Sequence, residues 1–316
     1  NDTGVLLDDR ITVNDRLTLN LGVRYDINRG GFPDYNRLTI GEPSISPSGS
    51  YLETDEVIPG VDVIKWNLVS PRVGIAYQPR ANGKTVIRGS FGVYYDQNVI
   101  GNWDAPPPGK PTFFLFTQGP TGEFDELISE QTSEDVEIHP DLRPPRTLQY
   151  AAGFEHQIAQ HVSIGTQYVY KRSQDLVGWE IVSGEWEPVR FTDPFTGTEY
   201  SLLSQLDEPR VRKGNDPGNF PGSEDLDYFQ RYHGLAFSMS KRYADNWGVN
   251  ASYTWSRSTG LIPRMLSQAQ FNPFYSSREG ADPNNFINAE GRLQADRPHM
   301  FRIQGVTRLP WDIQLS

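Results

Sequence analysis

Short and long connections between predicted strands alternate along this chain, and this alternation constrains its fold more than any other feature. Apolar and polar residues alternate with a period of two in ten segments, which is typical of strands with one apolar face. Short turns lie at 12–16, 79–84, 158–161, 242–246 and 309–312. Four long segments of 39, 49, 54 and 41 residues lie between them, at 27–65, 97–145, 174–227 and 257–297.

This order predicts an all-β, antiparallel, up-and-down meander whose long loops all lie at one end. Twenty of the 24 prolines fall in the long segments, and the other four stand at strand ends, as expected of a residue that cannot donate to a ladder. We expect the long segments to be loops and find no convincing helix. The ten predicted strands are 4–11, 17–26, 72–78, 87–95, 148–155, 162–171, 234–240, 247–255, 301–304 and 313–316.

A soluble sandwich or propeller also alternates, so the pattern alone does not choose between water and lipid. Aromatic residues favour lipid, because they stand at both ends of the apolar faces and would form two girdles. Mean hydropathy is only −0.57, as expected when alternate residues meet lipid and the loops are polar. We therefore predict that Leu19, Ile75, Phe237 and Val249 face lipid, and that Asn20, Arg88, Gln167 and Asn250 face a wet lumen.

Composition excludes several other classes. The 316 residues include no cysteine, so disulfide frameworks, zinc ribbons, iron–sulfur sites and cysteine nucleophiles are absent. The densest apolar run, 113–116, is far shorter than the roughly 18–20 residues of a membrane helix. A net charge of −11 argues against a general nucleic-acid binder.

No motif points to catalysis. The sequence contains no Gly-x-Ser-x-Gly elbow, phosphate-binding loop, His-Glu-x-x-His helix or dinucleotide fingerprint. The five histidines lack ligand spacing; His156 and His161 flank one turn and are interpreted as polar turn residues. Nothing singles out a carboxylate pair for acid–base chemistry. We expect no catalytic residue, no cofactor and no dedicated metal site.

Charge is divided between the long segments and the rest. The long segments hold 31 acidic and 14 basic residues, which suits either solubility alone or an acidic vestibule. Acidic pairs there, such as 207–208 and 224–225, are oxygen ligands of the type Ca²⁺ prefers, although no EF-hand spacing occurs. The predicted lumen is mildly basic, and its candidate residues for a substrate path are Arg24, Arg72, Arg88 and Lys171.

The segment 97–145 contains an apolar cluster beside a strongly acidic run. An exposed cluster of this size either packs under its own loop or contacts a ligand, a partner protein or the barrel mouth. Both interpretations stay open. The candidate contact residues are Phe113, Phe114 and Phe116.

Four predicted hairpins, taken in order, are similar to those of a known family. The segment 8–26, read Asp-Asp-Arg-Ile-Thr-Val-Asn-Asp-Arg-Leu-Thr-Leu-Asn-Leu-Gly-Val-Arg-Tyr-Asp, resembles a strand–turn–strand of TonB-dependent outer-membrane receptors. Segments 70–77 and 83–92 look like the next hairpin, and 251–256 and 296–301 also resemble the family, in particular its Oar-like branch. The likeness covers most predicted strands but little of the loops.

The resemblance implies a transmembrane barrel of 22 strands, closed by a plug and driven through TonB, that imports a ligand across the outer membrane of a Gram-negative bacterium. Outer-membrane lipid, lipopolysaccharide and TonB are its implied partners, with an unknown ligand or protein at the loops. We expect residues 1–316 to be a barrel segment, about ten strands of a larger barrel, with plug and N-terminal domains outside it. Two alternatives remain: a barrel with an adhesive, assembly or passive porin-like role, and a soluble β-rich carbohydrate-binding protein or enzyme.

Overall fold

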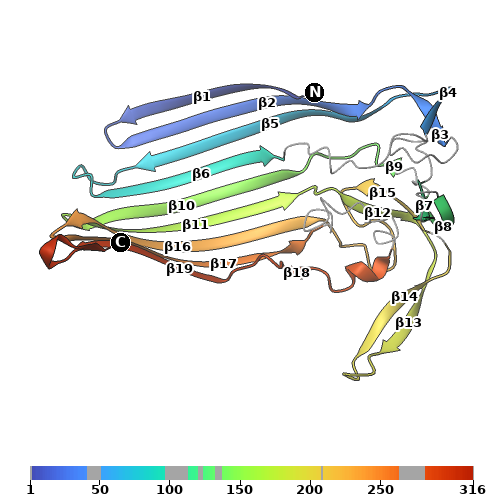
Figure 1. Ribbon diagram of the computed structural model, residues 1–316. Helices are drawn as coiled ribbons and strands as arrows, with labels where there is room; N and C mark the ends of the chain where they lie inside the picture. The colour runs from blue at the N-terminus through green and yellow to red at the C-terminus, as the bar shows by residue number, and fades with distance from the viewer. Residues whose placement is uncertain are drawn as a thin grey trace.

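One large antiparallel sheet dominates the computed structural model (Figure 1), which describes residues 2–40, 51–96, 113–119, 124–131, 137–207, 209–262 and 282–315. Ten of its strands pair in chain order, each with the next, and they match the ten predicted strands one for one. A short strand, β18 (Gly291–Arg292), adds to β17. The ten are β1 (Asp2–Asn14), β2 (Leu17–Phe32), β5 (Val61–Tyr77), β6 (Thr85–Tyr95), β10 (Arg146–Ala159), β11 (Val162–Gln174), β16 (Phe229–Ala244), β17 (Trp247–Leu261), β19 (His299–Arg308) and β20 (Gln314–Leu315).

The pairing register puts the residues that the sequence predicts to face lipid on one face of the sheet. Residues directly opposite in an antiparallel pair share a face, and Leu19 lies opposite Ile75 while Phe237 lies opposite Tyr253. Val249 lies opposite Lys241 in the same set, whereas Asn20, Arg88, Gln167 and Asn250 belong to the other face. The predicted alternation is therefore confirmed across the whole sheet.

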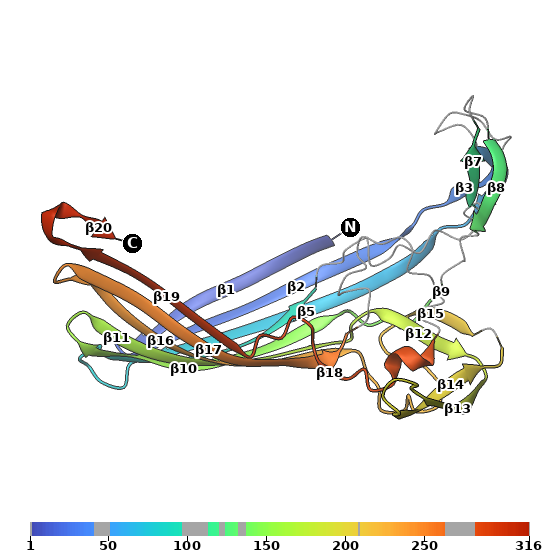
Figure 2. The same ribbon diagram turned by 60° about the horizontal axis from the view of Figure 1, so that its bottom comes forward.

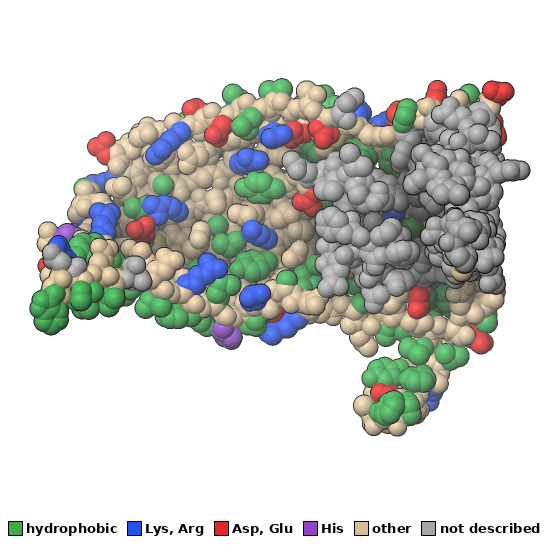
Figure 3. Space-filling view, in the orientation of Figure 1, with side chains coloured by type: hydrophobic (Ala, Val, Ile, Leu, Met, Phe, Trp, Pro, Cys, Tyr) green, Lys and Arg blue, Asp and Glu red, His purple; other side chains and the backbone are tan. Residues whose placement is uncertain are grey.

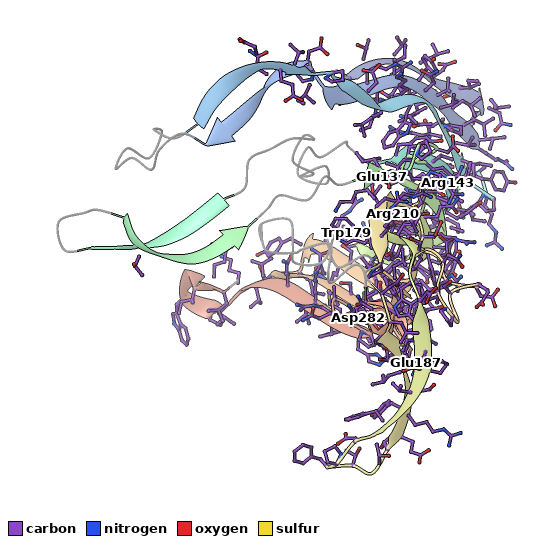
Figure 4. All side chains as sticks on the ribbon, turned by 90° about the vertical axis from the view of Figure 1, so that its right-hand side faces the viewer. Glu137, Arg143, Trp179, Glu187, Arg210 and Asp282 are labelled. Carbon is purple, nitrogen blue, oxygen red and sulfur yellow. The ribbon has the colours of Figure 1, made fainter. Side chains whose placement is uncertain are left out.

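The sheet is bent into a trough, seen from the side in Figure 2 and along its strands in Figure 4. Figure 3 looks onto its concave face, where polar, Lys and Arg side chains line a hollow. Among the described residues, no pair joins the first strand, β1, to the last strands, β19 and β20. The trough thus has two open edges.

Tight turns join the strands at the end opposite the long connections. Between β16 and β17 the central residues Asp245 and Asn246 have φ of 55° and 67°, the left-handed pair of a type I′ turn. This turn suits the right-handed twist of the strands, and Asp and Asn tolerate it better than most residues. At the first turn, the backbone N–H of Arg16 donates to the Asn14 side chain at 2.9 Å.

The long connections contain strands of their own, which corrects the expectation of plain loops. Six of these strands pair into three separate hairpins. The other three form a sheet of order β12-β15-β9, in which β9 and β15 run parallel. The three-stranded sheet joins segments distant in sequence, which period-two patterns do not report. They are β3 (Tyr35–Ile40), β4 (Tyr51–Ile58), β7 (Phe113–Gln118), β8 (Phe124–Gln131), β9 (Glu137–Ile138), β12 (Gly178–Ser183), β13 (Trp186–Thr192), β14 (Glu199–Gln205) and β15 (Arg210–Gly214).

The buried core lies in these connections and at the adjacent strand ends. Tyr228, Leu176 and Leu261 pack together, with Leu226 and Phe286 against them. Two short 3-10 helices occur in the described ranges, η3 (Pro283–Phe286) and η4 (Pro310–Asp312), and no described helix is long and apolar enough to cross a membrane. Large apolar residues on the convex face, such as Ile75 and Phe237, stay exposed.

Candidate ligand-binding surface

The concave face carries a continuous polar row that crosses six strands. The row begins at Arg72 of β5 and ends at Ser258 of β17. The residues between them, each directly opposite the next, are Gly92, Gln149, Lys171 of β11 and Tyr232 of β16. Neighbouring strands are about 4.8 Å apart, so three strand spacings put Arg72 and Lys171 about 14 Å from each other. All four predicted path residues lie on this face, but only these two share a row.

Carboxylates neutralise the other two predicted path residues. The Arg24 guanidinium contacts Asp26 of its own strand, with Nη2 2.8 Å from Oδ1. Arg88 lies four residues from Gly92, toward the tight turns, and its Nη1 is 3.2 Å from Glu155 Oε2 on the next strand. Both pairs are exposed to solvent, so each contributes little to stability. On the concave face, Arg24 and Arg88 are therefore each paired with a carboxylate.

Arg72 and Lys171 are the more available cations. The Arg72 guanidinium lies 5.0 Å from the centroid of the Tyr94 ring. Lys171 has no ion pair with any described residue and lines an open groove of about 560 Å³. Hydrogen-bonding side chains surround it there, from Thr147, Gln167, Ser173, Gln230 and Tyr232. This groove suits a polar or anionic ligand.

Glycines make room for two tyrosines on the same wall. A Cβ at Gly92 would lie 2.7 Å from the Tyr94 ring, and one at Gly234 would lie 2.5 Å from Tyr232 Oη. Each tyrosine therefore folds along its own strand over the glycine two residues away. The wall keeps flat aromatic surface beside Arg72 and Lys171, a combination that favours sugars or aromatic ligands.

A charged cluster joins the long connections to the end of the sheet. Asp175 follows β11, is 9% exposed and accepts from Arg143 Nε and Arg146 Nε, each at 3.1 Å. Its φ of 58° is left-handed, which Asp tolerates. Asn215 completes the cluster, because its side chain accepts from Arg143 N and donates to the carbonyls of Arg143 and Asp175. The sequence offers no periodic signal for this cluster.

The small sheet β12-β15-β9 forms a platform beside this cluster. Glu180 and Arg212 pair across it, with Arg212 Nε 2.9 Å from Glu180 Oε2, and Lys213 Nζ lies 3.6 Å from the centroid of the Trp179 ring. The Tyr228 hydroxyl donates to the Trp179 carbonyl at 2.6 Å. Figure 4 shows Glu137, Arg143, Trp179 and Arg210 gathered at the long-connection end of the trough. We call this group, residues 137–143 and 175–183 with 210–228, the loop platform.

Burial perturbs two ionisable groups of the loop platform. Desolvation, reinforced by the nearby charge of Asp175, raises the pKa of Asp227 above its ordinary value of 3.8. Desolvation likewise raises the pKa of Tyr228, whose ring is buried in the core. Desolvation is the largest cause of both shifts. These shifts are structural consequences of packing.

Histidines act as hydrogen-bond partners on the convex face. Tyr168 Oη lies 2.7 Å from His233 Nδ1, and Tyr253 Oη lies 2.8 Å from His299 Nδ1. The rings of Phe91, Tyr150, Tyr170 and His233 follow one another across four strands at 5.0, 6.0 and 5.0 Å between centroids. This aromatic belt lies toward the long connections, where the sequence predicts a girdle.

Two other predictions concern metals and the apolar cluster. Within the described ranges, no three His, Asp or Glu residues gather in a way that could hold a metal ion. Calcium in the acidic loops stays a prediction. The side chains of Phe113, Phe114 and Phe116 lie outside the described residues, although their backbone forms β7, paired with β8. Their role as contact residues also stays a prediction.

Comparison with known proteins adds a family. The model of a family described as an outer membrane beta barrel domain matches residues 1–314. The TonB-dependent transporter Oar of Myxococcus xanthus is 24% identical over an alignment of 341 positions, which covers 96% of this chain. The chain spans about a quarter (27%) of the length of that relative.

Solved structures with a related sheet include two from Escherichia coli. The ferric-catecholate import receptor Fiu is 15% identical with a TM-score of 0.47, over 99% of this chain and 33% of the receptor. The outer membrane transporter YddB is 13% identical with a TM-score of 0.47, over 96% of this chain and 39% of the transporter. The alcaligin receptor FauA of Bordetella pertussis is 13% identical with a TM-score of 0.43, over 98% of this chain and 34% of the receptor.

Proposed function

Because this chain belongs to the outer membrane beta barrel domain family, we propose that it forms part of the wall of an active transporter in the outer membrane of a Gram-negative bacterium. Its resemblance to TonB-dependent receptors of the Oar type is confirmed in sequence. In this proposal the loops capture a ligand, the polar wall conducts it, and regions outside this chain supply a plug and the contact with TonB.

The observation that carries the proposal is the division of the sheet into two faces. The exposed large apolar residues of the convex face suit lipid, while the concave face presents Arg72, Lys171 and their polar neighbours to water. The open edges at β1 and β19–β20 carry backbone groups that would each cost several kcal/mol if left unpaired in lipid. We therefore propose that about a dozen further strands close the barrel, with a lumen wide enough to need a plug.

The loop platform and the hairpin β7–β8 are the proposed capture surface. The platform presents the partly exposed side chains of Arg143 and Arg210, and Phe113, Phe114 and Phe116 would add an apolar contact. The groove beside Lys171 continues this surface into the trough. Contacts with membrane lipid and lipopolysaccharide belong to the same proposal.

Planar-bilayer conductance of the intact protein tests this function. A plugged, energised transporter should conduct no ions when reconstituted alone. In cells, dissipating the proton-motive force should abolish uptake and leave surface binding unchanged, because the loops remain. Steady passive conductance by the intact protein would contradict active transport and favour a porin.

A second role, in adhesion or assembly, is supported by the hairpin β13–β14. Figures 1 and 4 show it projecting beyond the sheet, away from the trough. Its tip residue Phe195 is 96% exposed, and Phe191 and Tyr200 are exposed beside it. Deleting 187–204 would abolish adhesion or assembly in this second role, whereas capture by the loop platform would continue in the first.

A further inference from the structure

Three arginines lie near one another on the convex face, one level with the aromatic belt and two just beyond it. Arg172 of β11 lies directly opposite Arg231 of β16, and Arg231 lies opposite Thr259 of β17. One step nearer the belt, Arg257 lies opposite His233. Directly opposed residues have Cα atoms about 4.5–5.5 Å apart, and opposed like charges destabilise a sheet. The fold therefore holds two guanidinium groups together at a cost.

The described part of the protein does not neutralise this group. Arg172 Nε is buried without any hydrogen-bond partner. Arg231 lies 5.3 Å from the centroid of the Phe229 ring, and neither it nor Arg257 has an ion pair with a described residue. The opposed cations Arg29 and Lys65 differ, since Arg29 donates to Asn67 and Lys65 pairs with Asp62. Unlike that pair, Arg172, Arg231 and Arg257 have no ion pair with a described residue.

A walled groove lies over Arg231 and Arg257, and Arg172 is on the strand beside it. It has a volume of about 890 Å³, and Arg231, Arg257, Tyr168 and Trp255 line it together with the segment 286–291. Glu290 is the acid among its lining residues, so the arginines dominate its charge. The wall is anchored, because Asn284 bonds both the N–H and the C=O of Leu203, and Phe286 stacks on Phe220 at 5.5 Å.

The arginines stand at the depth of lipid headgroups. Arg257 is two residues beyond Trp255, and Arg231 is four residues beyond Leu235, which is opposite Trp255. With a rise of about 3.4 Å per residue and a tilt of 35–45°, these steps reach roughly 5 and 10 Å above the level of Trp255, so Arg257 is level with the aromatic belt and Arg172 and Arg231 lie about 5 Å above it. The polar headgroup layer begins at that level, at the edge of the hydrocarbon core.

We propose that Arg231 and Arg257, with the positive charge of Arg172 beside them, bind the phosphate group of an acylated outer-leaflet lipid, whose chains lie along Tyr168 and Trp255. Guanidinium groups recognise phosphate through paired, charge-assisted hydrogen bonds. The aromatic end of the groove suits the start of an acyl chain. This site lies on the opposite face of the sheet from the proposed transport path and does not depend on it.

Binding of bisphosphorylated lipid A to the intact protein in uncharged detergent tests the proposal. Native mass spectrometry would compare wild type with the triple variant R172Q/R231Q/R257Q. We expect binding at least about tenfold weaker in the variant, because it loses several hydrogen bonds to a charged group. Dephosphorylated lipid A should bind wild type as weakly as the variant binds the bisphosphorylated lipid. Inorganic phosphate should not compete at millimolar concentration.

A matched control removes the same charge from the concave face, with R72Q/R88Q/R302Q. This control should bind lipid A as wild type does, and both variants should keep heat-modifiable migration as evidence of a folded barrel. The single variant R231Q adds a second readout. Compared with wild type, its melting temperature should be higher without lipid A and lower with lipid A. Equal lipid A binding by wild type and the R172Q/R231Q/R257Q variant, or equal loss in the concave-face control, would overturn the proposal, as would effective competition by inorganic phosphate.

Discussion

Replacing Asp175 with Asn should loosen the loop platform and leave the membrane sheet intact. Asn has nearly the same shape as Asp and also tolerates the left-handed φ of 58° at this position. The substitution removes the negative charge that pairs with both Arg143 and Arg146. Exposed ion pairs are worth about 0.2–1 kcal/mol, and breaking a fully buried pair costs about 3–5 kcal/mol. Asp175 is buried while both arginines are partly exposed, so we expect a local cost of about 2 kcal/mol.

Hydrogen exchange measures this cost where it is expected. A local loss of about 2 kcal/mol corresponds to roughly 30-fold faster exchange, since 1.4 kcal/mol is a factor of ten. The amides of Arg143 and Leu142, which bond to Asn215 and to His139, should show it. Asp62→Asn is the matched control, because it breaks an exposed pair with Lys65 and should change exchange little. Unchanged exchange at 142–143 in Asp175→Asn would refute the argument.

Three further predictions concern the faces, one hairpin turn and one loop. Phe237→Arg, on the convex face, should destabilise the barrel in lipid vesicles by about 2–4 kcal/mol, and Gln167→Arg on the concave face should cost far less; equal unfolding temperatures would contradict this. At the β13–β14 turn, the Phe195 N–H and the Thr196 hydroxyl hold the pKa of Asp193 below its ordinary value of 3.8. As the pH falls, the Asp193 carboxylate is therefore protonated in the unfolded turn before it is protonated in the folded turn. Its hydrogen bonds stabilise the folded turn above pH 3.8, and this stabilisation is lost as the pH falls below 3.8. The protection of the Phe195 amide, relative to its intrinsic exchange rate at each pH, should consequently fall in acid, but not in Asp193→Asn. Deleting 112–117 should impair ligand or partner binding and keep heat-modifiable migration; intact binding would favour a self-packed loop.

The strands of the large sheet could be predicted because one physical requirement repeats along each of them. A strand between lipid and water must alternate, so Leu19 and Asn20, or Val249 and Asn250, reveal their faces without knowledge of their neighbours. The tight turns follow from local chemistry too, as the positive φ of Asp245 and Asn246 illustrates. These features depend on residues close in sequence.

The loop platform could not be predicted, because its contacts join residues far apart in sequence. Asp175 meets Arg143 and Asn215 across 32 and 40 residues, and the Trp66 indole donates to the Leu142 carbonyl across 76. None of these contacts follows a period. Histidine roles were likewise visible only in space, since His233 and His299 each meet a tyrosine of another strand.

Lys241 shows where alternation alone misleads. Its register position is on the apolar face opposite Val249, where a bare charge would be costly. The structure turns its Nζ toward the tight turn, where it donates to the carbonyls of Ala244 and Trp247 and lies 4.0 Å from the Trp247 ring centroid. The long aliphatic stem lets the charge leave the apolar surface. The apolar face therefore stays continuous to its edge.

Cysteine labelling at two adjacent positions tests the central claim most directly. The chain has no native cysteine, so Val249→Cys and Asn250→Cys each introduce one thiol into the intact protein in lipid vesicles. A charged, water-soluble maleimide should label position 250, which faces the concave wall, and should spare position 249, which faces lipid. Labelling at 249 with protection at 250 would reverse the two faces and contradict the account.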